Sequence, residues 1–223
     1  MKNIKLAQKI MNLFPTDSIY LVGGSSRDYL LTGDFKDFDF ATPLTPNEVI
    51  LLLNVDTYDK FAYKFGTIKT KIFNQEVEIT SFRKEENYTD SRHPNEVIFI
   101  ADIKEDAKRR DFTINAIYLD KNLKVFDFYN GLADLKSKII RMIGNPYTRF
   151  KEDPLRIIRA LRFSLSLGFN LDKDLDEAIF SLKDEIKKIS SFRINSELNK
   201  MLKTNSKEEI ETIFKKHNLE IDF

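Results

Sequence analysis

The 223-residue sequence predicts an α/β head with a mixed sheet, followed by a region made of helices. In the first 140 residues, short β-rich runs alternate with turns and helix-like stretches, as in α/β domains. From residue 150 onwards the apolar residues recur with helical spacing, and Ser, Asn or Asp stand at the expected helix starts. We therefore expect a head domain of residues 1–140 and an all-helical domain of residues 141–223, both of normal domain size.

Glycines and helix-capping residues delimit the elements of the head. The β-rich run SIYLV ends at Gly23-Gly24, and the helix-like run that follows ends at Gly33. Alternation of apolar and polar residues predicts further strands, and a Thr-Pro start predicts a capped helix. The further elements expected in the head are a strand over residues 34–42, a helix over 45–54, a hairpin of 64–73 with 75–83, and a strand over 125–131.

The second domain has helix signals throughout. Its first helix is expected to begin at Asp153-Pro154 and to end at Gly168. The other helices are expected over residues 172–189, 195–204 and 206–219. The last two begin with Asn or Ser close to an acidic residue, as capped helices do.

The composition narrows the classes of function. Hydrophobic residues make up 42% and charged residues 32%, which excludes a chain that is disordered throughout. Lys and Arg number 36 and Asp and Glu 35, so the formal charge is +1 and any anion site depends on locally placed charge. There is no Cys, and the two histidines cannot form a multi-histidine cage, so Cys nucleophiles, disulfide scaffolds and zinc sites of these kinds are excluded.

The sequence shows no sign of a membrane or secreted protein. No apolar run approaches the roughly 18 residues that a membrane helix needs. The N-terminal run has scattered lysines and no small-residue cleavage site, so it is not typical of a signal peptide. A soluble protein of the cytoplasm is the simplest interpretation, and its oligomeric state stays open.

The run KDFDF places two carboxylates on one face of a strand. Asp37 and Asp39 are two residues apart, and the alternating Phe38 and Phe40 point to the other face. Such a carboxylate pair is costly unless a divalent cation neutralises it, and oxygen ligands of this kind suit Mg²⁺. The alternative is a solvent-exposed face of an edge sheet, which the spacing by itself favours.

A second acidic pair has the same spacing. Glu76 and Glu78 alternate with Val77 and Ile79, so a neighbouring strand can bring one of them to the same metal. The exposed-face alternative applies to these two residues as well.

The run GGSSRD follows a strand and opens a helix, a geometry in which backbone N–H groups meet phosphate. Arg27 stands in the first turn of that helix and can reach a triphosphate. The run matches neither a Rossmann fingerprint nor a P-loop. The equally supported alternative is an ordinary strand–turn–helix with a surface pair between Arg27 and Asp28.

Arginines gather at two further places. In RRDFTIN, Arg109 and Arg110 precede an apolar run and can bind phosphate or ribose, or else form a solvated basic corner. In the helix that follows Asp153, three arginines stand three residues apart on one broad face that can equally be solvated. They are Arg156, Arg159 and Arg162.

Asp153 can pair with Arg156, three residues later, and together they offer acceptor and donor edges to a nucleotide base. The competing role of Asp153 is that of a helix N-cap in front of Pro154, which would occupy its side chain.

Taken together and in this order, the motifs resemble those of the class II tRNA nucleotidyltransferases (CCA-adding enzymes) and of the related bacterial poly(A) polymerases. The resemblance runs from about Val22 to Leu202. The matching stretches are VGGSSRDYLL, KDFDFAT, KFGTI, EITSFR, YTDSRHP, KRRDFTINAIYLD, FYNGLADL, IGNPYTRFKEDPLRIIRALRF and, more weakly, FRINSELNKML.

The resemblance implies a head of the polymerase-β-type nucleotidyltransferase fold and a helical neck. It implies that Asp37 and Asp39 are catalytic and bind Mg²⁺, with Glu78 as a possible third acid. It further implies nucleotide-binding roles for seven residues. Gly24 and Arg27 contact the phosphates, Asp153 and Arg156 read the base edge, and Arg110, Arg159 and Arg162 are further nucleotide-contacting arginines. The implied reaction is template-independent addition of C nucleotides, A nucleotides or both from CTP and ATP to the 3′ end of tRNA. It implies two metal ions and selection of the base by protein side chains.

Two alternatives stay open beside this activity. One is a poly(A) polymerase that acts on general RNA, and the other is a non-catalytic nucleotide- or RNA-binding remnant. The runs KFGTI and YTDSRHP resemble the CCA-adding branch more than the poly(A) branch, and the second belongs to the segment that helps family members switch from C to A addition.

The sequence departs from the family in two respects. Family members usually continue into body and tail domains that hold the tRNA, and the 223 residues end after the neck, which suggests a minimal enzyme, a truncation or one half of a split system. Ser25-Ser26 stand where the family usually has a small and then an aliphatic residue, and we expect Ser26 to loosen packing under the glycine turn.

Overall fold

The computed structural model describes residues 2–88 and 94–220, and these fall into two compact units. Among the described residues, the first unit holds 2–87 and 94–135 and the second is formed mainly by 136–220. The division falls at Leu135. The functional assignment of 1–140 as head and 141–223 as neck stays a prediction.

The first unit is built on a six-stranded sheet in the order β3-β4-β2-β1-β7-β8. Strands β2 and β4 are parallel and the other neighbours are antiparallel, so the expected mixed sheet is confirmed. The strands are β1 (Tyr20–Leu21), β2 (Phe38–Thr42), β3 (Thr67–Ile72), β4 (Gln75–Ser81), β7 (Ile117–Leu119) and β8 (Val125–Asp127). A separate two-stranded sheet joins β5 (Arg83–Tyr88) to β6 (Pro94–Phe99).

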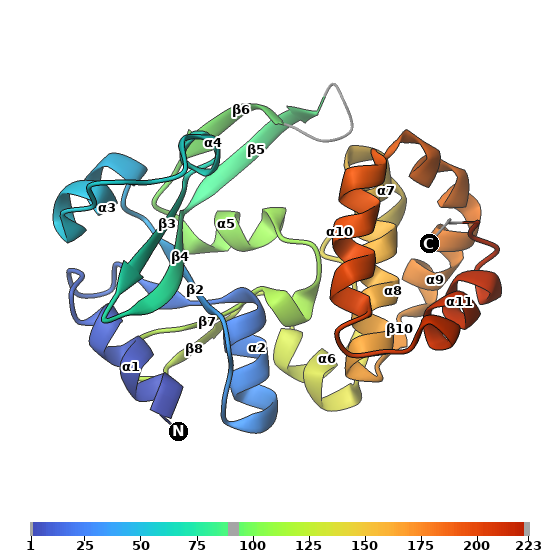
Figure 1. The fold of residues 1–223 in the computed structure, drawn as a ribbon, viewed down its shortest axis with the longest axis horizontal. Coiled ribbons are helices and arrows are strands. Elements are labelled where there is room, and N and C mark those ends of the chain that lie inside the picture. The colour runs from blue at the N-terminus through green and yellow to red at the C-terminus, as the bar shows by residue number, and fades with distance from the viewer. Residues whose placement is uncertain (1, 89–93, 221–223) are drawn as a thin grey trace. The chain divides into compact units, whose positions relative to one another are not determined.

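Helices cover this sheet, and α2 lies along β2 and β7 (Figure 1). As expected, α2 ends at Gly33, which has a φ of 78°. Helix α3 has a full capping box between Thr45 and Glu48, also as expected. The helices are α1 (Lys2–Met11), α2 (Gly23–Thr32), α3 (Pro46–Leu53), α4 (Lys60–Lys64), α5 (Ile103–Arg109), the short 3₁₀ helix η1 (Thr113–Asn115) and α6 (Gly131–Ser137).

One face of β2 lies in the core of the first unit. Phe38 and Phe40 are buried in one apolar cluster with residues of α1, among them Ile10 and Met11. The expected alternation is therefore present, because the phenylalanine face of β2 is buried and the opposite face stays available for carboxylates.

The second unit consists of helices and one short parallel strand pair, β9 (Ile139–Ile140) with β10 (Asn170–Leu171). Helix α8 contacts α7, α10 and α11 and forms the centre of the unit (Figure 1). The helices are α7 (Pro146–Glu152), α8 (Leu155–Leu167), α9 (Lys173–Leu182), the 3₁₀ helix η2 (Lys183–Lys188), α10 (Ser191–Met201) and α11 (Lys207–Lys216). Within the described part of the chain, no helix has both the length and the apolar character needed to cross a bilayer.

Candidate active site

The two carboxylates of the DFD motif stand at the start of β2. Asp37 is exposed just before the strand, and Asp39 is half-buried within it. The hydroxyl of Ser25, in the first turn of α2, donates to the carbonyl oxygen of Asp37 at 2.6 Å. The same hydroxyl accepts the N–H of Asp39 at 2.9 Å. One serine therefore ties α2 to the backbone that carries both carboxylates.

A row of charged side chains crosses the sheet at Asp39. Asp39 on β2 is paired in register with Glu78 on β4, and Glu78 is paired with Lys69 on β3. The Lys69 ammonium pairs with Glu78 at 2.9 Å. A neighbouring strand therefore brings Glu78 beside Asp39, and the expectation that the two share a metal stays a prediction.

This arrangement concentrates negative charge on Asp39. Burial, followed by the negative charges of Glu78 and Asp37, raises the pKa of Asp39 to about 6, while Arg110 and Lys69 oppose the rise. A carboxyl group with a raised pKa is one whose ionised form is poorly stabilised by the protein alone. A cation beside Asp39 would offset this cost.

The donor set fits Mg²⁺ with substrate ligands. Among residues 2–88 and 94–220, no three His, Cys, Asp or Glu side chains are arranged as a metal site. A cation held by Asp37 and Asp39 would take its remaining ligands from substrate phosphates and water, as Mg²⁺ commonly does.

The glycine turn lies directly beside Asp39. Gly23 has a φ of 70°, and a Cβ on it would stand 3.7 Å from Asp39 Oδ2. A Cβ on Gly24 would stand 3.9 Å from the same oxygen and 3.6 Å from Arg27 Nη2. The structure therefore brings together the glycine turn, Arg27 and the carboxylate strand, with no side chain from the turn to fill the space.

Arg27 is buried rather than a surface residue. Its Nε donates to Asp28 at 2.8 Å, so the expected pair exists. Its Nη1 also donates to Asn115 Oδ1 at 2.8 Å. Asn115 in turn donates to Asp111. The position of Arg27 is therefore set by the RRDFTIN motif, and Asn115 is a residue that the sequence reasoning missed although the motif contains it.

Ser26 does not loosen the packing, and this expectation was wrong. The side chain is fully buried, and its hydroxyl donates to the carbonyl oxygen of Ile117 on β7 at 2.7 Å. The hydrogen bond replaces the apolar contact of an aliphatic residue and fastens α2 to the sheet.

Arg110 is held by a buried carboxylate, Asp106. Arg110 donates to Tyr118 and to Asp106, and Tyr118 donates to Asp106 at 2.6 Å. Arg109 donates to the other carboxylate oxygen at 2.8 Å. Burial alone would raise the pKa of Asp106, but the two arginines and the Tyr118 hydrogen bond outweigh it and lower the pKa to about 2. Asp106 was not singled out from the sequence, since an acid in a charged helical run looks solvent-exposed.

A hollow of about 1180 Å³ opens on the β3–β4 side of the carboxylates. Asp37 and Asp39 line it together with Lys69 and Lys71 from β3. The carboxylates thus face a space large enough for a nucleotide-sized group.

In the second unit the expected pair of Asp153 with Arg156 is not formed, and this part of the prediction was wrong. The Asp153 carboxylate pairs with Arg193 of α10, and its Oδ1 also accepts the N–H of Leu155 at 3.1 Å. Arg156 donates instead to Glu152 and to the carbonyl oxygen of Arg149, each at 2.8 Å. Two contacts hold the Asp153 carboxylate away from Arg156, one from the N–H of Leu155 and one from Arg193. The N-cap alternative holds only in part, because the N-cap residue of α8 is Pro154 and Asp153 stands one residue before it.

The other two arginines of α8 are not a solvated stripe. Arg162 donates to the buried Glu197 of α10 at 2.6 Å, and Arg159 lies 3.7 Å from the same carboxylate. The positive charges of these arginines lower the pKa of Glu197 against the effect of its burial. Glu197 and Arg193 were both missed, although the run FRINSELNKML contains them.

Comparison with known proteins identifies the family. Residues 19–141 match the poly A polymerase head domain. The chain belongs to this family. Residues 168–217 of this poly A polymerase family member also match a probable RNA and SrmB-binding site of polymerase A.

Relatives of this poly A polymerase family member are similar over most of its length. A CCA-adding enzyme of Staphylococcus epidermidis is 41% identical over 187 residues, which are 84% of this chain and 46% of that protein. A CCA-adding enzyme of Enterococcus faecalis is 43% identical over 185 residues, 82% of this chain and 45% of that protein. The chain thus spans about half the length of the curated relatives it matches.

Solved structures agree with this assignment. The CCA-adding enzyme of Bacillus stearothermophilus in complex with CTP has a TM-score of 0.84 and 30% identity, covering 96% of this chain and 52% of that one. A tRNA nucleotidyltransferase complexed with a primer tRNA and an incoming ATP analog has a TM-score of 0.69 and 30% identity, covering 90% of this chain and 57% of that one. The expected fold class is confirmed. Residues 89–93, within the YTDSRHP run, lie outside the described residues.

Proposed function

We propose that this chain adds nucleotides from CTP and ATP to the 3′ end of tRNA. The observation that carries the proposal is the placement of Asp39 directly beside the glycine turn and Arg27, in a chain whose relatives are CCA-adding enzymes. Since tRNA is the proposed substrate, the cytoplasm is where we expect the protein to act.

In the proposed reaction, the 3′-hydroxyl oxygen of the tRNA bonds to the α-phosphorus of the nucleotide. The bond to the β-phosphate breaks and pyrophosphate leaves. Catalysis of this kind depends on position and on charge stabilisation rather than on a protein nucleophile. The absence of Cys is therefore no obstacle.

The first unit supplies the groups for the phosphates. Asp37 and Asp39 would hold Mg²⁺, whose chemistry is to stabilise the charge of the reacting phosphates and to ease ionisation of the attacking hydroxyl. Gly24 leaves room for a triphosphate beside Asp39, and Arg27 offers it a guanidinium held in place by Asn115. Arg110, fixed by Asp106, contacts the nucleotide.

The second unit supplies the groups for the base. Asp153 accepts a hydrogen bond from the exocyclic amino group of cytosine or adenine, and Arg156 donates to the neighbouring ring nitrogen. Arg159 and Arg162, held by Glu197, are further nucleotide-site arginines.

The test is incorporation of each labelled nucleotide into a tRNA transcript that lacks its 3′ CCA, with Mg²⁺ present. We expect CTP and ATP to be incorporated, and UTP and GTP to be rejected. Long A tracts on general RNA without use of CTP would instead identify a poly(A) polymerase. Failure to incorporate either nucleotide would leave a nucleotide- or RNA-binding protein and contradict the proposal.

A further inference from the structure

We propose that Arg193 is a positioning residue for base selection, because it holds the carboxylate of Asp153 in the orientation that meets the base. The inference rests on the proposed function and deepens it. It assigns a role to a residue of α10 that neither touches the reacting phosphates nor stands near Asp153 in the sequence.

The contact between the two residues is direct and specific. Nη2 of Arg193 lies 2.9 Å from Oδ2 and 3.1 Å from Oδ1 of Asp153, across 40 residues of sequence. Both side chains are largely buried, with 17% and 18% of their surfaces exposed. Partly buried charge pairs of this kind are screened much less by solvent than exposed ones.

The contacts of Asp153 leave one acceptor position for a ligand. Oδ1 receives the N–H of Leu155 and one contact from Arg193, and Oδ2 receives the other contact from Arg193. A carboxylate has about four acceptor positions, two on each oxygen. One position on Oδ2 is therefore left for an exocyclic amino group.

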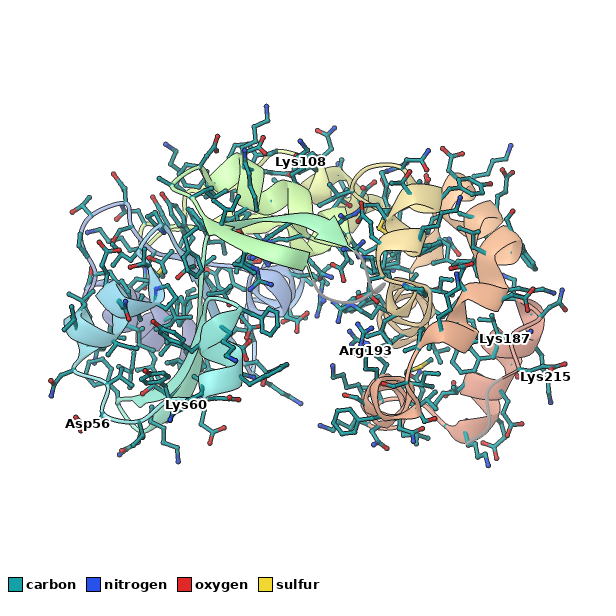
Figure 2. The ribbon with its side chains drawn as sticks, turned by 90° about the horizontal axis from the view of Figure 1, so that it is seen from above. Asp56, Lys60, Lys108, Lys187, Arg193 and Lys215 are labelled. Carbon is teal, nitrogen blue, oxygen red and sulfur yellow. The ribbon has the colours of Figure 1, made fainter. Side chains whose placement is uncertain are left out.

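Helix α10, which carries Arg193, is held against α8 by side-chain contacts. Four residues further along α10, Glu197 bonds Arg162 of α8, and beyond the end of α10, Asn205 lies 3.2 Å from Ser166. The contacting residues follow the same order along both helices, so α8 and α10 are packed side by side and parallel. Arg193 stands on the edge of the unit opposite Lys215 (Figure 2). The backbone position from which Arg193 reaches Asp153 is therefore fixed by contacts between α8 and α10.

A fixed carboxylate discriminates between bases by whether the base presents a hydrogen-bond donor or an acceptor to it. Cytosine and adenine present an amino donor at the position where uracil and guanine present a carbonyl acceptor. A carboxylate held in place accepts from the amino group and repels the carbonyl oxygen. When Arg193 is removed, Asp153 keeps only its contact with Leu155 and can turn, so selection among the four bases weakens.

The experiment measures kcat/KM and direct binding of CTP, ATP, UTP and GTP with the whole chain, Mg²⁺ and a tRNA transcript lacking CCA. The variants are Arg193→Ala and Arg193→Lys, whose ammonium can replace the single contacting nitrogen. The control is Arg141→Ala, which removes the pair of Arg141 with Asp172 in the same unit. Arg193→Gln takes the place of Arg193→Ala if the latter does not fold.

We expect Arg193→Ala to reduce the preference for CTP over UTP at least tenfold, within the range that one base-reading contact supplies. Arg193→Lys should recover part of that preference, and Arg141→Ala should keep all of it. An unchanged preference in the neutral Arg193 variant overturns the inference, and so does an equal loss in Arg141→Ala. A wild-type chain that neither binds nor uses CTP and ATP overturns the proposed function, and this inference with it.

Discussion

The hydroxyl of Ser25 donates a hydrogen bond of 2.6 Å to the carbonyl oxygen of Asp37. Because the same hydroxyl accepts the N–H of Asp39, helix α2 fixes the backbone on both sides of Phe38. The first turn of α2 also carries Gly24, beside which the phosphates are proposed to bind. Ser25 therefore links the proposed phosphate site to the proposed metal ligands.

Replacing Ser25 by alanine should impair catalysis more than folding. The change removes two hydrogen bonds, which costs about 1–3 kcal/mol of unfolding free energy. Slight misplacement of the carboxylates should lower kcat on the order of tenfold, since a misplacement of about 1 Å can cost about 100-fold. Denaturant unfolding and nucleotide incorporation measure the two effects.

Ser164→Ala is the matched control for Ser25→Ala. It removes a hydroxyl bond of 2.7 Å to the carbonyl oxygen of Phe169 in the second unit. It should lower stability and leave kcat unchanged. If Ser25→Ala behaves in the same way, the positioning role of Ser25 is wrong.

Alanine substitutions at Gly24 and at Gly23, the two glycines of the turn, should have different outcomes. A Cβ on Gly24 meets Arg27 and Asp39 only at ordinary contact distances, so Gly24→Ala should fold normally and weaken nucleotide binding about tenfold or more. Gly23 has a φ of 70°, so Gly23→Ala should also lose about 1 kcal/mol of stability. Nucleotide titration and thermal unfolding separate these effects.

Gly33→Ala supplies the control for backbone strain. Gly33 has a φ of 78°, and a Cβ on it meets nothing within 4 Å. The variant should lose stability as Gly23→Ala does, yet bind nucleotides like the wild type. Full nucleotide affinity in Gly24→Ala would show that the phosphates bind elsewhere.

Asp106 should make stability depend on acid pH. Its pKa in the folded protein is about 2, below the ordinary 3.8, so the ionised carboxylate favours the folded state. This contribution is complete above about pH 4 and is lost as the pH falls from there toward 2, by roughly 2 kcal/mol. Unfolding free energies measured between pH 2 and 6 should show this loss in the wild type.

In Asp106→Asn, that part of the pH dependence should disappear, and nucleotide binding should weaken because Arg110 loses its carboxylate partner and keeps the hydroxyl of Tyr118. Glu177→Gln, at an exposed pair with Lys173, should keep the wild-type profile. An unchanged acid limb in Asp106→Asn would contradict the role given to Asp106.

Local pattern predicted the parts of the site that depend on neighbours in sequence. Alternation in KDFDF was enough to predict the buried phenylalanine face of β2. The equal spacing in QEVEIT anticipated that Glu76 or Glu78 could lie beside Asp39, and the residue that does so is Glu78. A pattern of this kind follows from strand geometry alone.

Contacts between distant elements could not be predicted in this way. Arg193 reaches Asp153 from 40 residues away, and Ser25 reaches Asp37 only because α2 docks on β2 in one register. The hydrogen bonds of Asp106 and Glu197 likewise depend on how elements pack, and no residue spacing encodes that. The predicted pairing of Asp153 with Arg156 failed because the N–H of Leu155 and the distant Arg193 compete for the same carboxylate.

We propose that Asp39 serves a cation and a nucleotide and does not serve the fold. Burial and the charges of Glu78 and Asp37 disfavour its ionised form, as its pKa of about 6 indicates. The most direct measurement compares wild type and Asp39→Asn for nucleotide incorporation into tRNA lacking CCA and for the thermal unfolding midpoint, Tm. We expect incorporation to fall by at least about 100-fold, while Tm without metal stays the same or rises. An Asp39→Asn protein that still adds CTP and ATP at the wild-type rate, or that loses activity only because it unfolds, would contradict the account.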